Sequence, residues 1–259
     1  MLQKLNQYRQ KLQLPFQPKG ADFPAYRFEW VRDLEGLQQV QRFRARQFSQ
    51  QFAIQFASGL DQDLYDFNCE HAVLREKYSG EIVAYTRIRA FQGHELAQSY
   101  SATEFQLLPQ LHHLGRVVEV GRTCVHPEHR SGKALSILWL HLLPKVLLQM
   151  RAQYVLGCVS IRLAGNEARA YHTHQILQTL PAHQRLNIAS QQAFEPPMPS
   201  YSFIQDEKLP KLFASYLQMQ AQFSQQAFYD AEFNCLDYLV LLAPNVAAKN
   251  FILQKGLLQ

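Results

Sequence analysis

The chain has 259 residues, and its content of 47% hydrophobic and 12% aromatic residues is enough for a substantial core, which excludes a wholly disordered protein. The formal charge of +5 favours an acidic partner, such as an anionic membrane surface, a phosphorylated cofactor or an acidic carrier protein. No cluster of lysine and arginine with interleaved aromatic residues stands out, so nucleic acid is not expected as a partner.

The N-terminal half is predicted to alternate between strands and helices. Residues 1–24 are expected to form an N-terminal arm that begins with a short helix bearing apolar residues on one side, which either packs on the domain or lies at a membrane interface. A strand is expected at 26–31, followed by an amphipathic helix at 34–52. After an acidic connector at 59–71, the segment 72–91 is predicted to form a hairpin around a Ser-Gly turn.

The C-terminal half continues the alternation and adds an irregular segment and a tail. The predicted elements are a strand at 117–125, a loop at 126–133, a helix from Ala134 that Pro144 ends or kinks, a strand at 154–161, a helix at 168–178, an irregular insertion at 179–203, a helix at 208–223, a strand at 235–244 and a tail at 245–259. This order predicts an α/β fold, with a single mixed sheet, flanking helices and a C-terminal extension, in one domain over 1–259.

The sequence favours a cytoplasmic location. The longest apolar run, at 134–148, is interrupted by polar residues and is shorter than the roughly 20 residues that a membrane span needs. The start of the chain has no continuous apolar run of the kind that marks a signal peptide. Four widely spaced cysteines without a C-x-x-C pair indicate reduced thiols rather than disulfides or a zinc site.

The strand "VVEVGRTCV" at 117–125 is unusual because it places two charges in an apolar stretch. A charge there costs several kcal/mol unless it is paired or used in function. Strict alternation puts Glu119 and Arg122 on opposite faces, whereas a bulge near Gly121 would re-aim the side chains and splay the strand. One interpretation is a structural ion pair between Glu119 and Arg122. The other is that Glu119 takes a proton from an amine substrate.

The loop and helix start that follow this strand have the composition of an anion site. Free amides and the positive end of a helix dipole favour a bound phosphate or thioester there. The predicted ligands are Arg130, Ser131, Gly132 and Lys133, and the alternative is that Arg130 is a solvated loop residue.

Two other chemistries were considered for the same region. Cys124 is a candidate nucleophile, but it alternates with Val118 and Val120 and is therefore expected to face the core. The stretch from His126 to His129 contains metal-ligand residue types, yet adjacent loop histidines are typical of an ordinary polar loop. We expect neither a metal nor a covalent enzyme intermediate.

Together these features resemble the Gcn5-related N-acyltransferase (GNAT) superfamily, in which a bulged fourth strand leads into a pyrophosphate-binding loop and helix. In the loop that starts at Arg130, the expected glycine positions hold Lys133 and Leu135. A donor carried on acyl carrier protein has phosphopantetheine but no coenzyme A nucleotide, and would tolerate this departure.

A more specific resemblance covers residues 34–165 and, more weakly, 205–243. The stretches "FRARQF", "GLDQDLYDFNCEH", "VAYTRI", "EFQLL" and "EVGRTCVHPEHRSG" resemble the L-ornithine Nα-acyltransferases. The resemblance implies transfer of a long-chain, 3-hydroxylated acyl group from acyl carrier protein to the α-amine of ornithine, which gives lyso-ornithine lipid. It also implies an enzyme with no tightly bound cofactor and with peripheral contact at the inner face of the cytoplasmic membrane.

The acyl-homoserine lactone synthases share the same skeleton, and their pattern implies roles for individual residues here. Glu119 and Arg122 would be catalytic, and five residues would line the acceptor side: Arg44, Phe48, Asp63, Asp66 and Arg87.

Within that set, Asp63 and Asp66 either attract a cationic acceptor such as ornithine or lysine, or pair with the arginines to hold the N-terminal segment. Arg44 and Arg87 alternatively bind the acceptor carboxylate, since a guanidinium group fits it with two hydrogen bonds.

Three rival functions remain at this stage. An N-acyl amino acid synthase or an acyl-homoserine lactone synthase would use the same chemistry on another amine. A non-catalytic module that binds acyl carrier protein or lipid would have no need of Glu119.

Overall fold

The computed structural model of the protein describes residues 26–131, 133–199 and 208–244. The predicted arm at 1–24 and tail at 245–259 lie outside these residues, as does Gly132.

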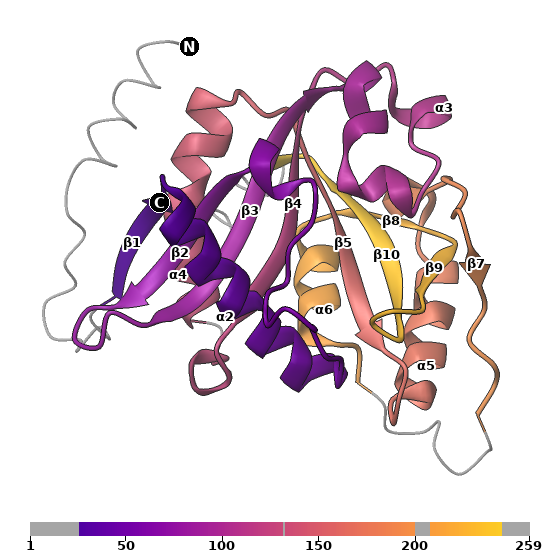
Figure 1. Ribbon diagram of the computed structural model, residues 1–259. Coiled ribbons are helices and arrows are strands. Elements are labelled where there is room, and N and C mark those ends of the chain that lie inside the picture. The colour runs from indigo at the N-terminus through magenta and orange to yellow at the C-terminus, as the bar shows by residue number, and fades with distance from the viewer. Residues whose placement is uncertain (1–25, 132, 200–207, 245–259) are drawn as a thin grey trace, which may run out of the picture.

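A single ten-stranded mixed sheet organises the fold, in the order β1-β2-β3-β4-β5-β10-β8-β6, with β9 paired to β10 and β7 paired to β9 (Figure 1). The strands are β1 (Tyr26–Val31), β2 (Glu70–Glu76), β3 (Ile82–Gln92), β4 (Arg116–Val125), β5 (Tyr154–Arg162), β6 (Arg185–Leu186), β7 (Ala193–Phe194), β8 (Gln222–Ser224), β9 (Ala227–Asp230) and β10 (Cys235–Leu242). Parallel pairing joins β4 to β5 and β6 to β8, and antiparallel pairing joins the others. The predicted single mixed sheet is confirmed.

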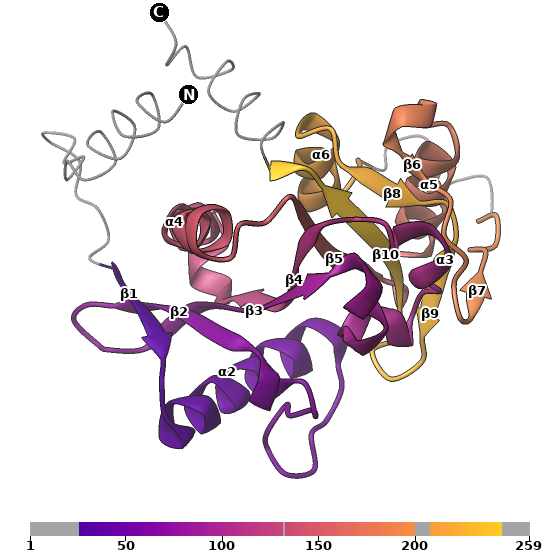
Figure 2. The same cartoon turned by 90° about the horizontal axis from the view of Figure 1, so that it is seen from above.

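Helices cover both faces of the sheet, as Figure 2 shows from above. Helix α2 (Leu34–Phe52) packs on one face, together with the short helical segments η2 (Gly93–Gln98), η3 (Tyr100–Thr103) and α3 (Leu108–Leu111). Helices α4 (Lys133–Pro144), α5 (Glu167–Gln178) and α6 (Lys211–Gln218) pack on the other face. We call these the α2 face and the α4 face.

Local sequence explains why α2 begins and ends where it does. The Asp33 side chain accepts a hydrogen bond from the Gly36 amide at 2.7 Å, which satisfies one of the free amides of the first turn. Ala53 ends the helix in the left-handed region, with φ of 60°. Val40 and Phe43 on its inner side are fully buried in the core.

Two segments differ from the sequence expectation. The helix predicted at 208–223 ends at Gln218, because Gln220 adopts a φ of 63° and the chain then enters β8. The described part of the predicted irregular insertion, 179–199, contributes β6 and β7 to the sheet and buries Ile188. Pro144 ends α4 as predicted, and one π-helical turn follows at Lys145–Gln149.

Strands β4 and β5 diverge, and this divergence creates the space that the functional site uses. They pair only over Val117–Glu119 and Tyr154–Leu156. The register between β3 and β4 shifts just beyond this point, and Arg122 has a φ of 51°. The predicted bulge near Gly121 is therefore confirmed, one residue further along, and it turns β4 away from its parallel neighbour.

Gly157 lies where the two strands part, and it permits their close approach. A Cβ atom at this position would lie 2.5 Å from the Val120 carbonyl oxygen. We predict that Gly157→Ala lowers the free energy of unfolding by about 1–3 kcal/mol, since the strands must shift to admit the methyl group. Urea unfolding measures this loss.

Gly121→Ala is the matched control, because its added Cβ would meet only the Arg87 side chain, at 3.8 Å. Equal destabilisation by both substitutions would contradict the assigned role of Gly157.

Candidate active site

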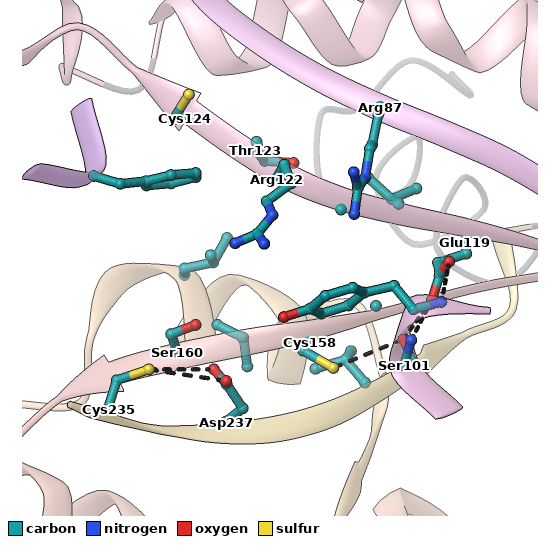
Figure 3. Close-up of a pocket in the computed structure, with 18 of the residues that line it drawn as sticks. Arg87, Ser101, Glu119, Arg122, Thr123, Cys124, Cys158, Ser160, Cys235 and Asp237 are labelled. Atoms are coloured by element: carbon teal, nitrogen blue, oxygen red, sulfur yellow. Dashed lines mark hydrogen bonds between the residues drawn. The ribbon is translucent and has the colours of Figure 1, made fainter. Parts of the chain in front are cut away.

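A cavity of about 370 Å³ fills the gap between β4 and β5 (Figure 3). Its polar part opens on the α2 face and is lined by Arg87, Ser101, Glu104, Glu119, Arg122 and Asp237. Its apolar part lies toward the α4 face and is lined by Leu135, Val155, Leu212, Tyr216, Val240 and Leu242. Residues from both faces of the sheet therefore line the cavity, with most of the charged groups on the α2 face and mainly hydrocarbon on the α4 face, apart from His129 and Arg130 near the start of α4.

Behind the polar part, a buried ion-pair network ties the acidic connector to α2. Arg44 is fully buried, and its two terminal nitrogens lie 2.7 and 2.9 Å from the two carboxylate oxygens of Asp66. Its Nε lies 2.8 Å from Asp61 Oδ2, and it also donates to the Asp61 carbonyl. Burial works to raise the pKa of Asp66, but the hydrogen bond and charge of Arg44 outweigh it and the pKa falls well below its usual range.

Arg87 and Arg122 connect this network to the cavity. Arg87 Nη1 lies 2.6 Å from Asp63 Oδ1 and 2.7 Å from Asp66 Oδ1, so this guanidinium is firmly held. Arg122 is held less tightly, at 3.5 Å from Asp63 and 3.8 Å from Asp61. Its guanidinium carbon lies 5.2 Å from the ring centroids of both Tyr100 and Phe233 and 5.9 Å from that of Phe48.

The structure separates the residues predicted for the acceptor side into two groups. Phe48 and Arg87 line the cavity, whereas Arg44 and Asp66 are enclosed behind it and Asp63 lies between, partly exposed. The geometry thus favours the alternative in which the aspartates pair with the arginines. Enclosure also leaves Arg44 no surface with which to meet an acceptor carboxylate.

Glu119 is satisfied by backbone and hydroxyl donors rather than by a cation. Its Oε1 accepts hydrogen bonds from the Ser101 amide and the Ser101 hydroxyl, both at 2.7 Å, and its Oε2 accepts one from the Tyr100 amide at 3.1 Å. The alternative of a Glu119–Arg122 ion pair is wrong, because Arg122 pairs with the connector aspartates instead. A carboxylate has about four acceptor positions, so one remains on Oε2 beside the cavity.

Glu104 and Asp237 were not among the residues predicted from the sequence, yet both line the cavity. Glu104 follows η3 and is 3% exposed, and Asp237 lies on β10 and is 4% exposed. Burial raises the pKa of Asp237 to about 6, although a hydrogen bond with Ser160 opposes it. Burial and the charge of Asp237 raise the pKa of Glu104 well above its usual range.

Of these two residues, only Asp237 could have been identified from the sequence pattern. It is the single charge in the apolar strand "CLDYLVLL", as Glu119 and Arg122 are the charges in β4.

The predicted phosphate loop lies at the entrance to α4. Arg130 lines the cavity and its Nε donates to the Val125 carbonyl at 2.9 Å, while Ser131 is exposed and Lys133 starts the helix. The fourth predicted ligand, Gly132, lies outside the described residues. The N-terminus of α4, where the positive end of the helix dipole lies, is therefore beside the cavity.

The structure also bears on the two rival chemistries, a cysteine nucleophile and a metal site. Cys124 is buried, as predicted, and burial raises the pKa of its thiol far above the usual range, which disfavours the nucleophilic thiolate. All four cysteines are free. Donor atoms of His126, Glu128 and His129 lie within 4.8 Å of one another, and the His129 ring hydrogen-bonds the Tyr26 hydroxyl at 2.6 Å. The expectation of no metal stays a prediction.

Comparisons with known proteins find an acetyltransferase domain and acyltransferase relatives. The family model for the acetyltransferase (GNAT) domain matches residues 43–140. An L-ornithine N(alpha)-acyltransferase of Rhodobacter capsulatus is 25% identical over 241 residues, which cover 84% of this chain and 90% of that protein. A protein of the same name from Agrobacterium fabrum is 27% identical over 216 residues, covering 76% of this chain and 71% of that one. The chain contains a GNAT domain and is an acyltransferase.

Among solved structures, FeeM, an N-acyl amino acid synthase from uncultured soil microbes, superposes on the acyltransferase with a TM-score of 0.48 and 12% identity. The match covers 90% of this chain and 99% of FeeM. Across 26–131, 133–199 and 208–244, no helix of the acyltransferase combines the length and the apolar character needed to cross a membrane.

The ion-pair network predicts a large effect of removing one charge. Asp66→Asn leaves Arg44 and Arg87 without a shared buried carboxylate, and the free energy of unfolding at pH 7 should fall by about 3–5 kcal/mol. Because the folded pKa of Asp66 is lowered, its contribution is present above the ordinary aspartate pKa and is lost only as the pH falls below it.

Denaturant unfolding at pH 7 checks the size of this loss. Glu29→Gln is the control, since the Glu29 carboxylate is partly exposed and its ion pairs with Arg27 and Arg75 should contribute less than about 1 kcal/mol. Similar losses in the two variants would contradict the network's structural role.

Ionised Asp237 should lower the stability of the folded protein, in contrast to Asp66. Its pKa is raised from 3.8 to about 6 in the folded protein, so its ionisation subtracts stability as the pH rises through this interval. Asp237→Asn is therefore expected to raise the free energy of unfolding by about 3 kcal/mol at pH 8 and by close to nothing at pH 4. Urea unfolding at the two pH values tests the sign, and an equal effect at both would rule out this account.

Proposed function

We propose that this acyltransferase moves a long-chain, 3-hydroxylated acyl group from acyl carrier protein to the α-amine of L-ornithine, giving lyso-ornithine lipid. The observation that carries the proposal is the division of the cavity into a charged end and an apolar end on opposite faces of the sheet. Such a passage suits a reaction that joins an amino acid to a hydrocarbon chain. The names of the relatives from Rhodobacter and Agrobacterium support ornithine as the acceptor.

The donor would enter from the α4 face. Beyond Glu119, β4 has no pairing with β5, so its backbone groups on that side are available for the amides of a phosphopantetheine arm. The phosphate of that arm would bind at the start of α4, where we assign Arg130, Ser131, Gly132 and Lys133. The apolar lining from β5, β10 and α6 would take the acyl chain.

The acceptor would enter from the α2 face, where charged side chains line the cavity. Arg122 would bind the acceptor carboxylate, because its two ion pairs are long and its guanidinium projects into the cavity (Figure 3). Phe48 and Arg87 would line the same end of the cavity. In this proposal Arg44, Asp63 and Asp66 act indirectly, by holding the two cavity arginines in place.

Glu119 would act as the general base through the free position on Oε2. It removes a proton from the α-ammonium, and the resulting amine attacks the thioester carbonyl carbon. The C–N bond forms as the C–S bond breaks, and the pantetheine thiolate leaves and takes up a proton. The amine attacks directly, so no acyl-enzyme is required.

The net positive charge suits both the acidic carrier protein and an anionic membrane that receives the amphiphilic product. The proposed location is therefore the cytoplasm, with peripheral contact at the inner face of the membrane.

Replacing Glu119 tests the proposed base. In Glu119→Gln the amide oxygen retains acceptor capacity for Ser101 but the proton acceptor is gone, so kcat should fall at least about 100-fold with a small change in KM. Purified protein, long-chain 3-hydroxyacyl carrier protein and ornithine are the components of the assay, and circular dichroism verifies folding.

Ser101→Ala is the matched control, since it removes one hydrogen bond to Glu119 and keeps the carboxylate. It should retain a kcat within about tenfold of the wild type. Normal turnover by Glu119→Gln would show that another group is the base.

A further inference from the structure

Glu104 and Asp237 form a buried acidic pair on the wall of the cavity opposite Arg122. Figure 3 shows Asp237 beside β5 and β10, below the Arg122 guanidinium that projects from β4. Both carboxylates are almost fully enclosed by protein, and both contact the cavity.

Neither carboxylate forms an ion pair within the described ranges 26–131, 133–199 and 208–244, although the charge of Arg122 acts on Asp237 from across the cavity and opposes the rise of its pKa. The ion pairs there join arginine or lysine to other carboxylates, and Arg122 is directed to Asp61 and Asp63. The neutral side chains of Tyr100 and Cys158 hydrogen-bond the Glu104 carboxyl group, and its Oε2 atom has no hydrogen-bond partner among the described residues. Asp237 is contacted by neutral groups, the Ser160 hydroxyl and the Cys235 thiol, the latter at 3.8 Å.

Negative charge that is buried and lacks a counterion is destabilising, so it is retained only where another interaction offsets the loss of stability. A bound cation would do so, since it supplies the missing charge and a donor for the free Glu104 oxygen. The cavity is the route by which such a cation reaches the pair.

We propose that Glu104 and Asp237 bind the side-chain ammonium of the acceptor, while Arg122 holds its carboxylate. This assignment rests on the proposed function and deepens it, because it makes the enzyme selective for basic amino acids with a terminal amine. The two ends of the acceptor would be fixed on opposite walls. Its α-amine would then lie between them, near the point where β4 and β5 part.

Norleucine provides a direct test, because it replaces the terminal ammonium of ornithine by a methyl group of nearly the same size. The assay measures kcat/KM for L-ornithine and L-norleucine with the purified full chain and a defined acyl carrier protein donor. The wild type should prefer ornithine at least about 100-fold, as expected for a lost contact between a buried charge and its partner.

The variants Glu104→Gln and Asp237→Asn should each lower kcat/KM for ornithine at least about 30-fold and leave the value for norleucine within about threefold. Glu81→Gln, on the exposed hairpin turn, makes the same charge change far from the cavity and should leave both values unchanged. The ornithine-to-norleucine ratio of the wild type needs no variant, so it holds even if one substitution prevents folding.

Equal use of ornithine and norleucine by the wild type would overturn the proposal and leave acyl transfer itself intact. An equal loss of kcat for both acceptors in Asp237→Asn would also overturn it, since this would make Asp237 a base rather than a binding residue.

Calorimetry without donor separates failure of this proposal from failure of the proposed function. If neither acceptor is acylated, ornithine binding by the wild type that is lost in both variants would still support the acidic pair. Absence of ornithine binding would overturn it.

A metal is the competing occupant, because donor atoms of Asp230, Cys235 and Asp237 lie within 4.8 Å of one another. Titration with Zn²⁺ addresses this case. Zinc binding that Asp237→Asn abolishes, with ornithine binding unchanged, would contradict the proposal.

Discussion

The divergence of β4 and β5 is the feature on which the rest of the site depends. The strands share backbone hydrogen bonds only up to Glu119, after which the left-handed residue Arg122 turns β4 away. The resulting gap leaves backbone groups of a central sheet without a strand partner and opens a passage between the two faces. In the proposed reaction the acyl donor and the acceptor meet in this passage, which a continuous sheet would close.

The charged side chains of the site are arranged around this gap. Arg87 and Arg122 face it, and they are held from behind by Asp63 and by the enclosed Arg44–Asp66 pair. Glu119 is anchored by the amides of Tyr100 and Ser101, so the proposed base and the η3 segment that precedes Glu104 are fixed together. The site therefore combines cationic groups on β3 and β4 with acidic groups on β4, directly after η3 and on β10.

Much of the fold could be predicted because hydrophobic periodicity and breakers determine it locally. The helix at 34–52 and the strand at 26–31 agree with their predicted bounds, and the bulge followed from a glycine beside two charges in an apolar strand. The parts that could not be predicted depend on long-range contacts. Strand β8 replaces the end of a predicted helix because β10 offers it a partner, and Asp237 meets Glu104 only through the order of strands in the sheet.

Mass spectrometry of lipids from a heterologous host that expresses this chain tests the central claim most directly. The account predicts a new N-acyl-ornithine, with the amide on the α-nitrogen and the side-chain amine free. An amide on the side-chain nitrogen, or a new N-acyl amine built on a neutral amino acid, would contradict it.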